Sequence, residues 1–279
     1  MGGDAEWLVT ATDPKDVVQT LGLCREHGVP WRVLGGGSNL LIDDGGVAGV
    51  VLAPRGICFE YVTVAGERVV AGAAVRLHRL LTQAAEWGLS GLEPLAGVPG
   101  TLGGAVVGNA GGRHGDIGSA VSAVVGYSAA GELLRRGGDG LHFGYRDSNL
   151  RDLVVTAVEL SLRSGVKEEI AARMAEIIEE RRRSQPLDAR SAGCFFRNPP
   201  AGRSAGELID RAGLKGVRSG GAEVSPVHAN YIVNRGGATS RDILSLVALV
   251  RDTVRQQFGV QLELEVQLWS KNGLPGCPP

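Results

Sequence analysis

The sequence has almost no excess of charge of either sign and no long apolar run. Its formal net charge is −1, which argues against a protein that binds nucleic acid or an anionic membrane surface through its overall charge. No apolar run approaches the roughly 20 residues of a membrane-spanning helix. The N-terminus, MGGDAEWLVT, lacks the basic and then apolar layout of a signal peptide. We therefore expect a cytoplasmic protein with no nucleic-acid partner and no membrane insertion.

Cysteine is also scarce. The four cysteines, Cys24, Cys58, Cys194 and Cys277, are scattered without a C-x-x-C pair, so the sequence predicts neither a disulfide framework nor a zinc site. The five histidines show no ligand spacing, and we expect no bound metal. Cys24 lies on the apolar face of a predicted helix, which favours the core. Cys277 lies in a Pro- and Gly-rich tail that we expect to be frayed.

The length and a change of composition predict two domains. At about 150 residues per domain, 279 residues correspond to about two. The first half mixes short predicted strands with a few helices, whereas two long helical stripes dominate the chain after Ser164. We therefore expect an α+β fold, with one domain over residues 1–163 and a smaller α+β domain over residues 164–279.

Local signals place the elements. Asp13 followed by Pro14 predicts a helix start, and Gly28 predicts its end. Further helices are predicted over 76–87, over 166–183, and from an N-cap at Ser240 to a stop at Gly259. The strand candidates are 31–34, 40–44, 49–53, 61–66, 68–73, 120–133, 152–162, 230–234 and 260–269.

Glycine is the abundant residue, and its distribution is uneven. The 43 glycines cluster in GGGSN at 35–39, DGGVAG at 44–49 and GVPGTLGGAVVGNAGG at 97–112. The bare backbone N–H groups of such loops can hold phosphate. GGGSN taken alone is a weak signal for phosphate binding, and a hairpin turn is the alternative. The G-x-G-x-x-G dinucleotide fingerprint is absent because Leu40 occupies its last glycine position. Two side-chain-free segments about 60 residues apart favour an extended, phosphate-bearing cofactor over a purely structural explanation.

Together these segments carry a resemblance to a known family. The pair LGGGSNLLI and GVPGTLGGAVVGNAGG resembles the flavin-binding domain of the vanillyl-alcohol-oxidase (PCMH) type, and more narrowly the MurB family, the UDP-N-acetylenolpyruvoylglucosamine reductases. FGYRDS, SAGCFFRNP, LIDRAGLKG, VSPVHANYIVN and FGVQLELEV follow in order, so that the resemblance covers residues 5–268. It implies a two-part FAD-binding domain, roughly 1–57 and 58–163, and a substrate-binding domain over 164–279. The short link after FGYRDS resembles the subtype without an inserted substrate loop, and we expect a monomer.

The resemblance also implies a reaction. Members of the family use FAD and NADPH to reduce the enolpyruvyl ether of UDP-N-acetylglucosamine to a lactyl ether, which gives UDP-N-acetylmuramate for peptidoglycan synthesis. Hydride reaches the terminal methylene carbon, negative charge builds on the carboxylate as an enolate, and a proton reaches the neighbouring carbon. Such a reaction requires a group that stabilises the enolate and a proton donor.

Three residues match the family's catalytic positions. The family motif G-S-x-F-K-N-P here contains Cys194 in place of serine. A thiol, with a reference pKa of about 8.5, is a better acid than a hydroxyl, and an inert buried cysteine is the alternative. Arg146 matches the arginine whose fork can hold a carboxylate. Glu265 matches the catalytic glutamate; strand alternation puts Glu263 on the same face, and only the family motif, with glutamate before Val266, selects Glu265.

The binding residues follow from the same motifs. The resemblance places FAD along two segments, with contacts at Gly35, Gly36, Gly37, Ser38, Asn39 and Leu40, and at Pro99, Gly100, Thr101, Gly103, Gly104, Asn109 and Gly111. It places the UDP-sugar at Asn198, Lys215 and His228, although a surface lysine and a hydrogen-bonded structural histidine would look the same. Two positions depart from the family pattern. Arg190 replaces a frequent proline, which predicts a different loop geometry, and Ser184 replaces a frequent basic residue, which predicts the loss of one phosphate contact.

Two other functions stay open at this point. One is another oxidoreductase of the same fold, such as an oxidase, against which the motifs of the second half speak. The other is a non-catalytic UDP-sugar- or flavin-binding relative, which the cysteine at position 194 keeps open. The presence of both Arg146 and Glu265 argues against this second function, because binding alone does not require a stabiliser and an acid.

Overall fold

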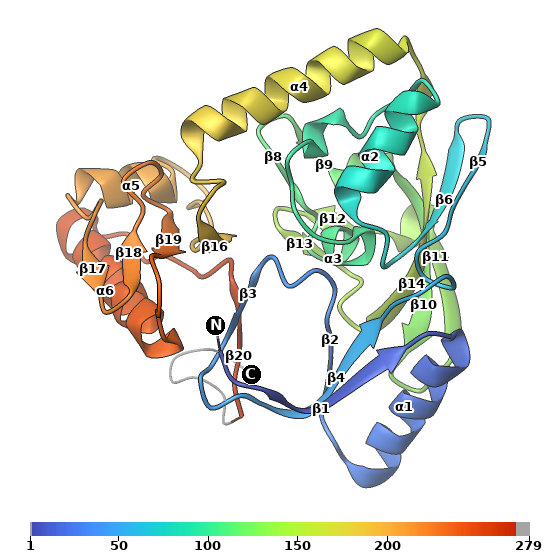
Figure 1. Cartoon of the computed structure of the whole chain (residues 1–279), viewed down its shortest axis with the longest axis horizontal. Coiled ribbons are helices and arrows are strands. Elements are labelled where there is room, and N and C mark those ends of the chain that lie inside the picture. The colour runs from blue at the N-terminus through green and yellow to red at the C-terminus, as the bar shows by residue number, and fades with distance from the viewer. Residues whose placement is uncertain (1, 272–279) are drawn as a thin grey trace. The chain divides into compact units, whose positions relative to one another are not determined.

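The computed structural model describes residues 2–271, which form two compact units (Figure 1). The larger unit consists of Trp7–Gly37 and Gly49–Glu180, and the smaller unit of Ser38–Ala48 with the described residues of 1–6 and 181–279. Helix α4 (Lys167–Ser184) inserts Ile177 into the core of the larger unit, so this compact unit extends beyond residue 163. The expected domain ranges, 1–163 and 164–279, stay a prediction. Cys277 lies outside the described residues.

The larger unit is built on an antiparallel sheet in the order β11-β10-β14-β6-β5. Strand β14 is buried along almost its whole length because apolar side chains pack on both of its faces. Its helices and strands are, in chain order, β1 (Ala5–Ala11), α1 (Pro14–His27), β2 (Trp31–Val33), β4 (Val47–Pro54), β5 (Val62–Ala65), β6 (Arg68–Gly72), α2 (Leu77–Glu86), β7 (Leu89–Ser90), α3 (Leu102–Val107), β8 (Gly111–Gly112), β9 (Gly115–Asp116), β10 (Val121–Ser128), β11 (Leu133–Gly137), β12 (Phe143–Gly144), β13 (Asp147–Ser148), β14 (Leu153–Ser161), β15 (Arg163–Ser164) and α4. Short 3₁₀ turns cover Glu93–Leu95, Ile117–Ala120 and Gly138–Gly140.

The smaller unit has a second antiparallel sheet, in the order β16-β19-β18-β17. Helix α6 buries an apolar stripe that includes Ile243, Val247 and Val250 in the same core as Phe195 and Phe196. The elements of this unit are β3 (Leu40–Ile42), β16 (Arg190–Cys194), α5 (Ala205–Arg211), β17 (Arg218–Ser219), β18 (Ala222–Val224), β19 (Tyr231–Asn234), α6 (Ser240–Phe258) and β20 (Gln267–Trp269).

The helix ends show which local signals hold. Asp13 caps α1 by accepting a hydrogen bond from the Lys15 N–H, and Gly28 ends it at a φ of 63°, as predicted. The predicted cap of α6 is wrong by one residue. Thr239 is the N-cap and accepts from the Asp242 N–H at 3.1 Å, because the Ser240 hydroxyl instead bonds to the Asp44 carboxylate at 2.9 Å. The buried position predicted for Cys24 on α1 is confirmed.

The predicted strand over 260–269 is correct only at its end. Residues 267–269 form β20, which pairs in parallel with β3. Before it, the backbone makes single hydrogen bonds to the segment after β16: the Arg197 N–H donates to the Glu263 carbonyl at 2.9 Å, and the Glu265 N–H to the Phe195 carbonyl at 2.8 Å. The alternation of apolar and polar residues therefore correctly indicated an extended backbone. It does not predict a continuous ladder of hydrogen bonds to a neighbouring strand.

Within residues 2–271, no helix is long and apolar enough to cross a membrane. The same residues contain no group of three or more His, Cys, Asp or Glu side chains placed to hold a metal ion.

Candidate active site

Cys194 ends β16, directly opposite Tyr231 of β19. The strand pairing slips between Ser191 and Cys194, and Gly193 takes a φ of 85° in the slip. A residue with a side chain adopts this left-handed conformation only at a cost, which explains the glycine before the cysteine. Cys194 is half-buried, and the chain becomes fully buried at the next residue, Phe195.

The segment after Cys194 is held rigidly by one buried amide. Phe195 donates its N–H to the Asn230 carbonyl at 2.8 Å, and Phe196 donates to Asn230 Oδ1 at 3.0 Å. Asn230 Nδ2 returns a hydrogen bond to the Phe196 carbonyl at 2.7 Å. Because both phenylalanines are only 1% exposed, packing and hydrogen bonds together fix the backbone that carries the thiol.

Glu265 is attached to the same segment, and the structure separates it from Glu263. Its N–H bonds to the Phe195 carbonyl, and its carbonyl accepts from Asn39 Nδ2 at 3.0 Å. Glu265 is half-buried and its charge acts on Tyr231, whereas Glu263 is exposed. The smaller unit therefore brings together Cys194 and Glu265, two of the three residues that were matched to catalytic positions.

Tyr231 completes this cluster, although no motif of the sequence had indicated it. Its hydroxyl donates to Gln185 Oε1 at 3.1 Å and shares a hydrogen bond with the Cys194 side chain. Burial, and then the neighbouring Cys194, raise the pKa of Tyr231 well above its usual value, with a further rise from Glu265 and an opposing effect from Arg181. The pattern NYIVN predicted a strand, but nothing in it reveals which residue lies opposite Tyr231.

Arg146 belongs to the larger unit, in the tight turn that joins β12 to β13. Its φ is 55°, a left-handed value that is uncommon for arginine and that occurs preferentially where surrounding structure enforces it. Here Asn109 Nδ2 donates to the Gly144 carbonyl at 2.8 Å, and Ser148 Oγ donates to the Val107 carbonyl at 2.7 Å. These two bonds tie both sides of the turn to the end of α3, so the Arg146 backbone is pre-organised.

The two predicted glycine loops touch within the larger unit. A Cβ placed on Gly36 would lie 2.7 Å from the Gly100 Cα, and one on Gly35 would lie 2.7 Å from Thr101 Oγ1. Side chains at these two positions are therefore excluded by the contact between the loops. Gly37 is glycine for a different reason, a φ of 67°.

This contact leaves exposed backbone that fits FAD. Gly36, Gly37 and Gly104 are exposed. A Cβ on Gly37 would meet its nearest atom at 3.8 Å and a Cβ on Gly104 at 3.6 Å, which are ordinary contact distances. A cofactor can therefore approach the main chain closely there. Not every predicted contact offers a free group, because the Gly103 N–H donates to the Ala73 carbonyl at 2.8 Å and both ends of the Asn109 amide bond to backbone.

A small cavity beside these loops adds cations that the sequence analysis missed. Its volume is about 110 Å³, and Arg55, Arg76, Arg79 and Thr101 line it with Glu60. Arg55 Nη2 also donates to the Gly35 carbonyl at 3.0 Å, which anchors the first loop. Isolated arginines in unrelated elements carry no sequence pattern that could have indicated this grouping.

The three predicted substrate contacts all lie in the smaller unit. Asn198 Oδ1 accepts from the Ala205 N–H at the start of α5, and Lys215 pairs with Asp210 at 2.7 Å. His228 Nδ1 accepts from the Asn230 N–H at 3.2 Å, so the ring's proton sits on Nε2. Burial, and then the charge of Lys215, lower the pKa of His228, and the ring is neutral at pH 7. Lys215 and His228 are thus electrostatic neighbours.

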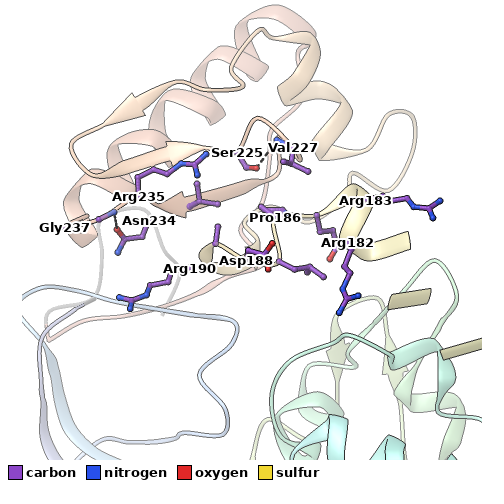
Figure 2. Close-up of a pocket in the computed structure, with 15 residues that line it drawn as sticks. Arg182, Arg183, Pro186, Asp188, Arg190, Ser225, Val227, Asn234, Arg235 and Gly237 are labelled. Atoms are coloured by element: carbon purple, nitrogen blue, oxygen red, sulfur yellow. Dashed lines mark hydrogen bonds between the residues drawn. The ribbon is translucent and has the colours of Figure 1, made fainter. Parts of the chain in front are cut away.

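A larger cavity of about 790 Å³ opens on the smaller unit (Figure 2). It lies between the segment 182–190 and the end of β19, and Gln185 and Ser225 are among its lining residues. The charged side chains around it are Arg182, Arg183, Arg190, Arg235 and Asp188. Arg235 is paired with the buried Glu223 at 2.6 Å. The other three guanidinium groups still outnumber the one carboxylate, which favours an anionic occupant, and the volume suits a nucleotide-sized molecule.

Two family models match successive parts of the chain. A family model described as UDP-N-acetylenolpyruvoylglucosamine reductase, C-terminal domain, matches residues 185–269, and one described as FAD binding domain matches residues 5–135. A UDP-N-acetylenolpyruvoylglucosamine reductase of Geobacter metallireducens is 42% identical over 269 residues, which cover 96% of this chain and 89% of the relative. The chain belongs to the UDP-N-acetylenolpyruvoylglucosamine reductase family.

Further members agree with this assignment. A reductase of this family from an Anaeromyxobacter species is 46% identical over 276 residues, which cover 96% of this chain and 84% of that one. The crystal structure of the MurB reductase from Thermus caldophilus superposes with a TM-score of 0.82 at 42% identity, over 94% of this chain and 91% of that one. The expected α+β fold with a FAD-binding domain is confirmed.

Proposed function

We propose that the protein is a FAD-dependent reductase that converts UDP-N-acetyl-3-O-(1-carboxyvinyl)-glucosamine to UDP-N-acetylmuramate, with NADPH as the reductant, in peptidoglycan precursor synthesis. Membership of the reductase family supports the reaction class. The observation that carries the proposal for this chain is the cluster of Cys194 and Glu265 around one buried tyrosine. It supplies a proton donor and an adjacent carboxylate, which binding alone does not require.

FAD would be held along the glycine loops of the larger unit. The exposed backbone at Gly36, Gly37 and Gly104 supports this placement, and Arg55 stands beside the first loop, where a cation suits phosphate. When bound, FAD supplies the hydride that the enolpyruvyl group receives. The chain's own residues then have to bind the substrate carboxylate and provide a proton.

In the proposed mechanism, the Arg146 guanidinium binds the substrate carboxylate and stabilises the charge that develops on it as an enolate. The Cys194 thiol gives its proton to the carbon next to that carboxylate: the S–H bond breaks, the new C–H bond takes the electron pair of the enolate, and a thiolate remains. Glu265, attached one residue from Cys194 through the Phe195 carbonyl, supplies a carboxylate at the reacting group.

Both proposed substrates are polyanions, which suits the arginine-lined cavity of the smaller unit. The cavity with Arg182, Arg183, Arg190 and Arg235 would receive phosphate groups. Asn198, Lys215 and the neutral His228, whose Nε2–H can donate, would contact the UDP-sugar. We also propose that the protein acts in the cytoplasm as a monomer, which light scattering coupled to size-exclusion chromatography tests.

The test is a two-step measurement on purified protein. The bound flavin is reduced with NADPH in the absence of oxygen, the enolpyruvyl substrate is added, and the flavin absorbance is followed. We expect rapid reoxidation with formation of UDP-N-acetylmuramate. A flavin that is reduced but stays reduced would point to another oxidoreductase of this fold or to a binding protein, and a protein that takes up no FAD would overturn the assignment of both glycine loops.

A further inference from the structure

Tyr231 stands against the proposed proton donor on the neighbouring strand. The register of β16 and β19 pairs Tyr231 with Cys194, and residues directly opposite each other in an antiparallel pair have Cβ atoms about 4.5–5.5 Å apart on the same face. Tyr231 is 9% exposed, and one edge of its ring packs against His228 at a centroid distance of 5.0 Å. The tyrosine is therefore fixed by the core, on the same face of the sheet as the thiol.

The Tyr231 hydroxyl has two hydrogen-bond partners, Gln185 and Cys194, and either of them can accept its hydrogen. In the structure it donates to Gln185 Oε1 at 3.1 Å and shares a hydrogen bond with the Cys194 side chain. A tyrosine hydroxyl has one hydrogen and can also accept, so donation to Gln185 leaves its oxygen to accept from the thiol. Once the thiol has lost its proton, the sulfur becomes the stronger acceptor, and the hydroxyl hydrogen can turn from Gln185 to the sulfur.

We propose that Tyr231 is a positioning residue for Cys194: its hydroxyl orients the thiol in the resting protein and donates a hydrogen bond to the thiolate that remains after proton transfer. The inference rests on the proposed function, in which Cys194 protonates the product. Charge and protons balance within the pair, because the negative charge passes from the enolate to sulfur while Tyr231 keeps its O–H bond.

The surroundings of Tyr231 show whether its hydroxyl acts as a hydrogen-bond donor or passes protons on as a relay. A relay would pass through a tyrosinate, which burial and the nearby Cys194 and Glu265 disfavour, and the opposing charge of Arg181 does not prevent the rise in pKa. The neutral His228 ring on its other side adds no cation. Tyr231 therefore stays protonated and acts through its hydrogen bond.

The first test measures the thiol and is independent of turnover. The flavin-loaded protein is treated with iodoacetamide over a range of pH, and the labelling of the Cys194 peptide is followed by mass spectrometry. In Tyr231→Phe we expect about tenfold less thiolate at a given pH, because one hydrogen bond to the charged sulfur is lost. Tyr127→Phe, which removes the hydroxyl of a half-buried tyrosine in the larger unit, should leave the profile unchanged.

For a second variant we expect the opposite change in the thiolate fraction of Cys194. This variant keeps the proposal testable if Tyr231→Phe does not fold. Gln185→Leu removes the competing acceptor, so the hydroxyl hydrogen is left to the sulfur and the thiolate fraction should rise. A Cys194 profile that stays unchanged in both variants overturns the proposal. So does a fall of the thiolate fraction in Gln185→Leu, since that result would show a general disturbance of the strand pair.

The kinetic test is a double-mutant cycle on the reoxidation step. Tyr231→Phe should slow reoxidation by the enolpyruvyl substrate about tenfold and leave reduction by NADPH unchanged. In a Cys194→Ala background, the same change should add nothing, because the thiol through which Tyr231 acts is gone. Equal slowing in both backgrounds would overturn the inference. A wild-type protein that the substrate does not reoxidise would instead contradict the proposed function, and the alkylation profiles would still decide the Tyr231–Cys194 relationship.

Discussion

The backbone N–H of Glu265 donates to the carbonyl oxygen of Phe195 over 2.8 Å, and Phe195 directly follows Cys194. The distance of Glu265 from the thiol is therefore set by backbone, which a change of its side chain leaves intact. Glu265→Gln should keep this bond while it removes the charge. We expect kcat to fall about 10²–10⁴-fold, the usual contribution of a positioned acid–base group, measured by steady-state NADPH oxidation.

The control for this prediction lies two residues away. Glu263→Gln changes an exposed carboxylate on the same extended segment, and we expect kcat to be unaffected. Equal losses in Glu263→Gln and Glu265→Gln would show that the segment matters only through its fold.

Cys194 is expected to be replaceable by serine and not by alanine. Cys194→Ala removes the proton donor and should slow formation of UDP-N-acetylmuramate about 10²–10⁴-fold in the reoxidation step. Cys194→Ser offers a hydroxyl at the same place and should retain substantial activity. If the alanine variant turned over within about twofold of the wild type, Cys194 would be a structural cysteine.

The contact between the glycine loops predicts a loss of flavin. Gly36→Ala places a methyl group 2.7 Å from the Gly100 Cα, and neither loop can yield without moving backbone. We expect purified Gly36→Ala to contain much less FAD than the wild type, measured from the ratio of flavin to protein absorbance. Gly22→Ala is the matched control, because nothing lies within 4 Å of a Cβ there. In the interior of α1 it should stabilise the fold by about 0.5–1 kcal/mol and leave FAD content unchanged.

The hydrogen bonds of Glu159 predict that the folded protein loses stability in acid. Glu159 is 8% exposed on β14, and hydrogen bonds from Arg135 and then Arg68 hold its pKa below the usual range. Since the folded pKa is the lower one, the stabilisation is fully present above the unfolded value of about 4.3 and disappears as the pH falls through the folded pKa. Glu159→Gln should lower the free energy of unfolding at neutral pH by about 1–3 kcal/mol and weaken its acid dependence, measured by urea unfolding.

An exposed ion pair of the same sheet serves as the comparison for Glu159. Asp152 pairs with Arg136 but its side chain is 61% exposed, so Asp152→Asn should cost only about 0–1 kcal/mol. A Glu159→Gln variant as stable as Asp152→Asn at every pH would contradict the role assigned to the buried Glu159 carboxylate.

The arginine-lined cavity predicts a change in substrate affinity. Arg190→Ala removes one of its four guanidinium groups, and we expect the KM for the UDP-sugar to rise about tenfold with little change in kcat, as for lost uniform binding. Arg241→Ala, which removes an exposed arginine of α6 outside the cavity, is the control. A KM unchanged in Arg190→Ala would indicate that the phosphates bind elsewhere.

The sequence was most informative where a single residue determines the local backbone. Asp13, Pro14 and Gly28 fixed the ends of α1 because capping and left-handed conformations depend on the residue itself. At α6 the rule was misleading, since Ser240 prefers a partner nearly 200 positions away in the chain, Asp44, and leaves the cap to Thr239.

The candidate site could be predicted only in part, and for a physical reason. The family motifs single out Cys194, Arg146 and Glu265, because each lies at a position that the resemblance matches to a catalytic residue. Tyr231 reaches the thiol through the register of two strands, and register depends on tertiary packing that one strand's sequence does not contain. Strand alternation likewise puts Glu263 and Glu265 on the same face. Only the backbone hydrogen bonds of the folded chain show that Glu265 is the residue attached next to Cys194.

The pairing of β3 with β20 sets an order of events during synthesis. Asn39 and Glu265, which bond to each other at the end of this pair, are 226 positions apart. All residues of the larger unit have been made once the ribosome reaches Glu180, whereas Leu40–Ile42 cannot pair until β20 has been made. The nascent chain can therefore form the larger unit first and carry Leu40–Ile42 as an unpaired strand, which makes this stretch the point where a chaperone or a premature stop would act on folding.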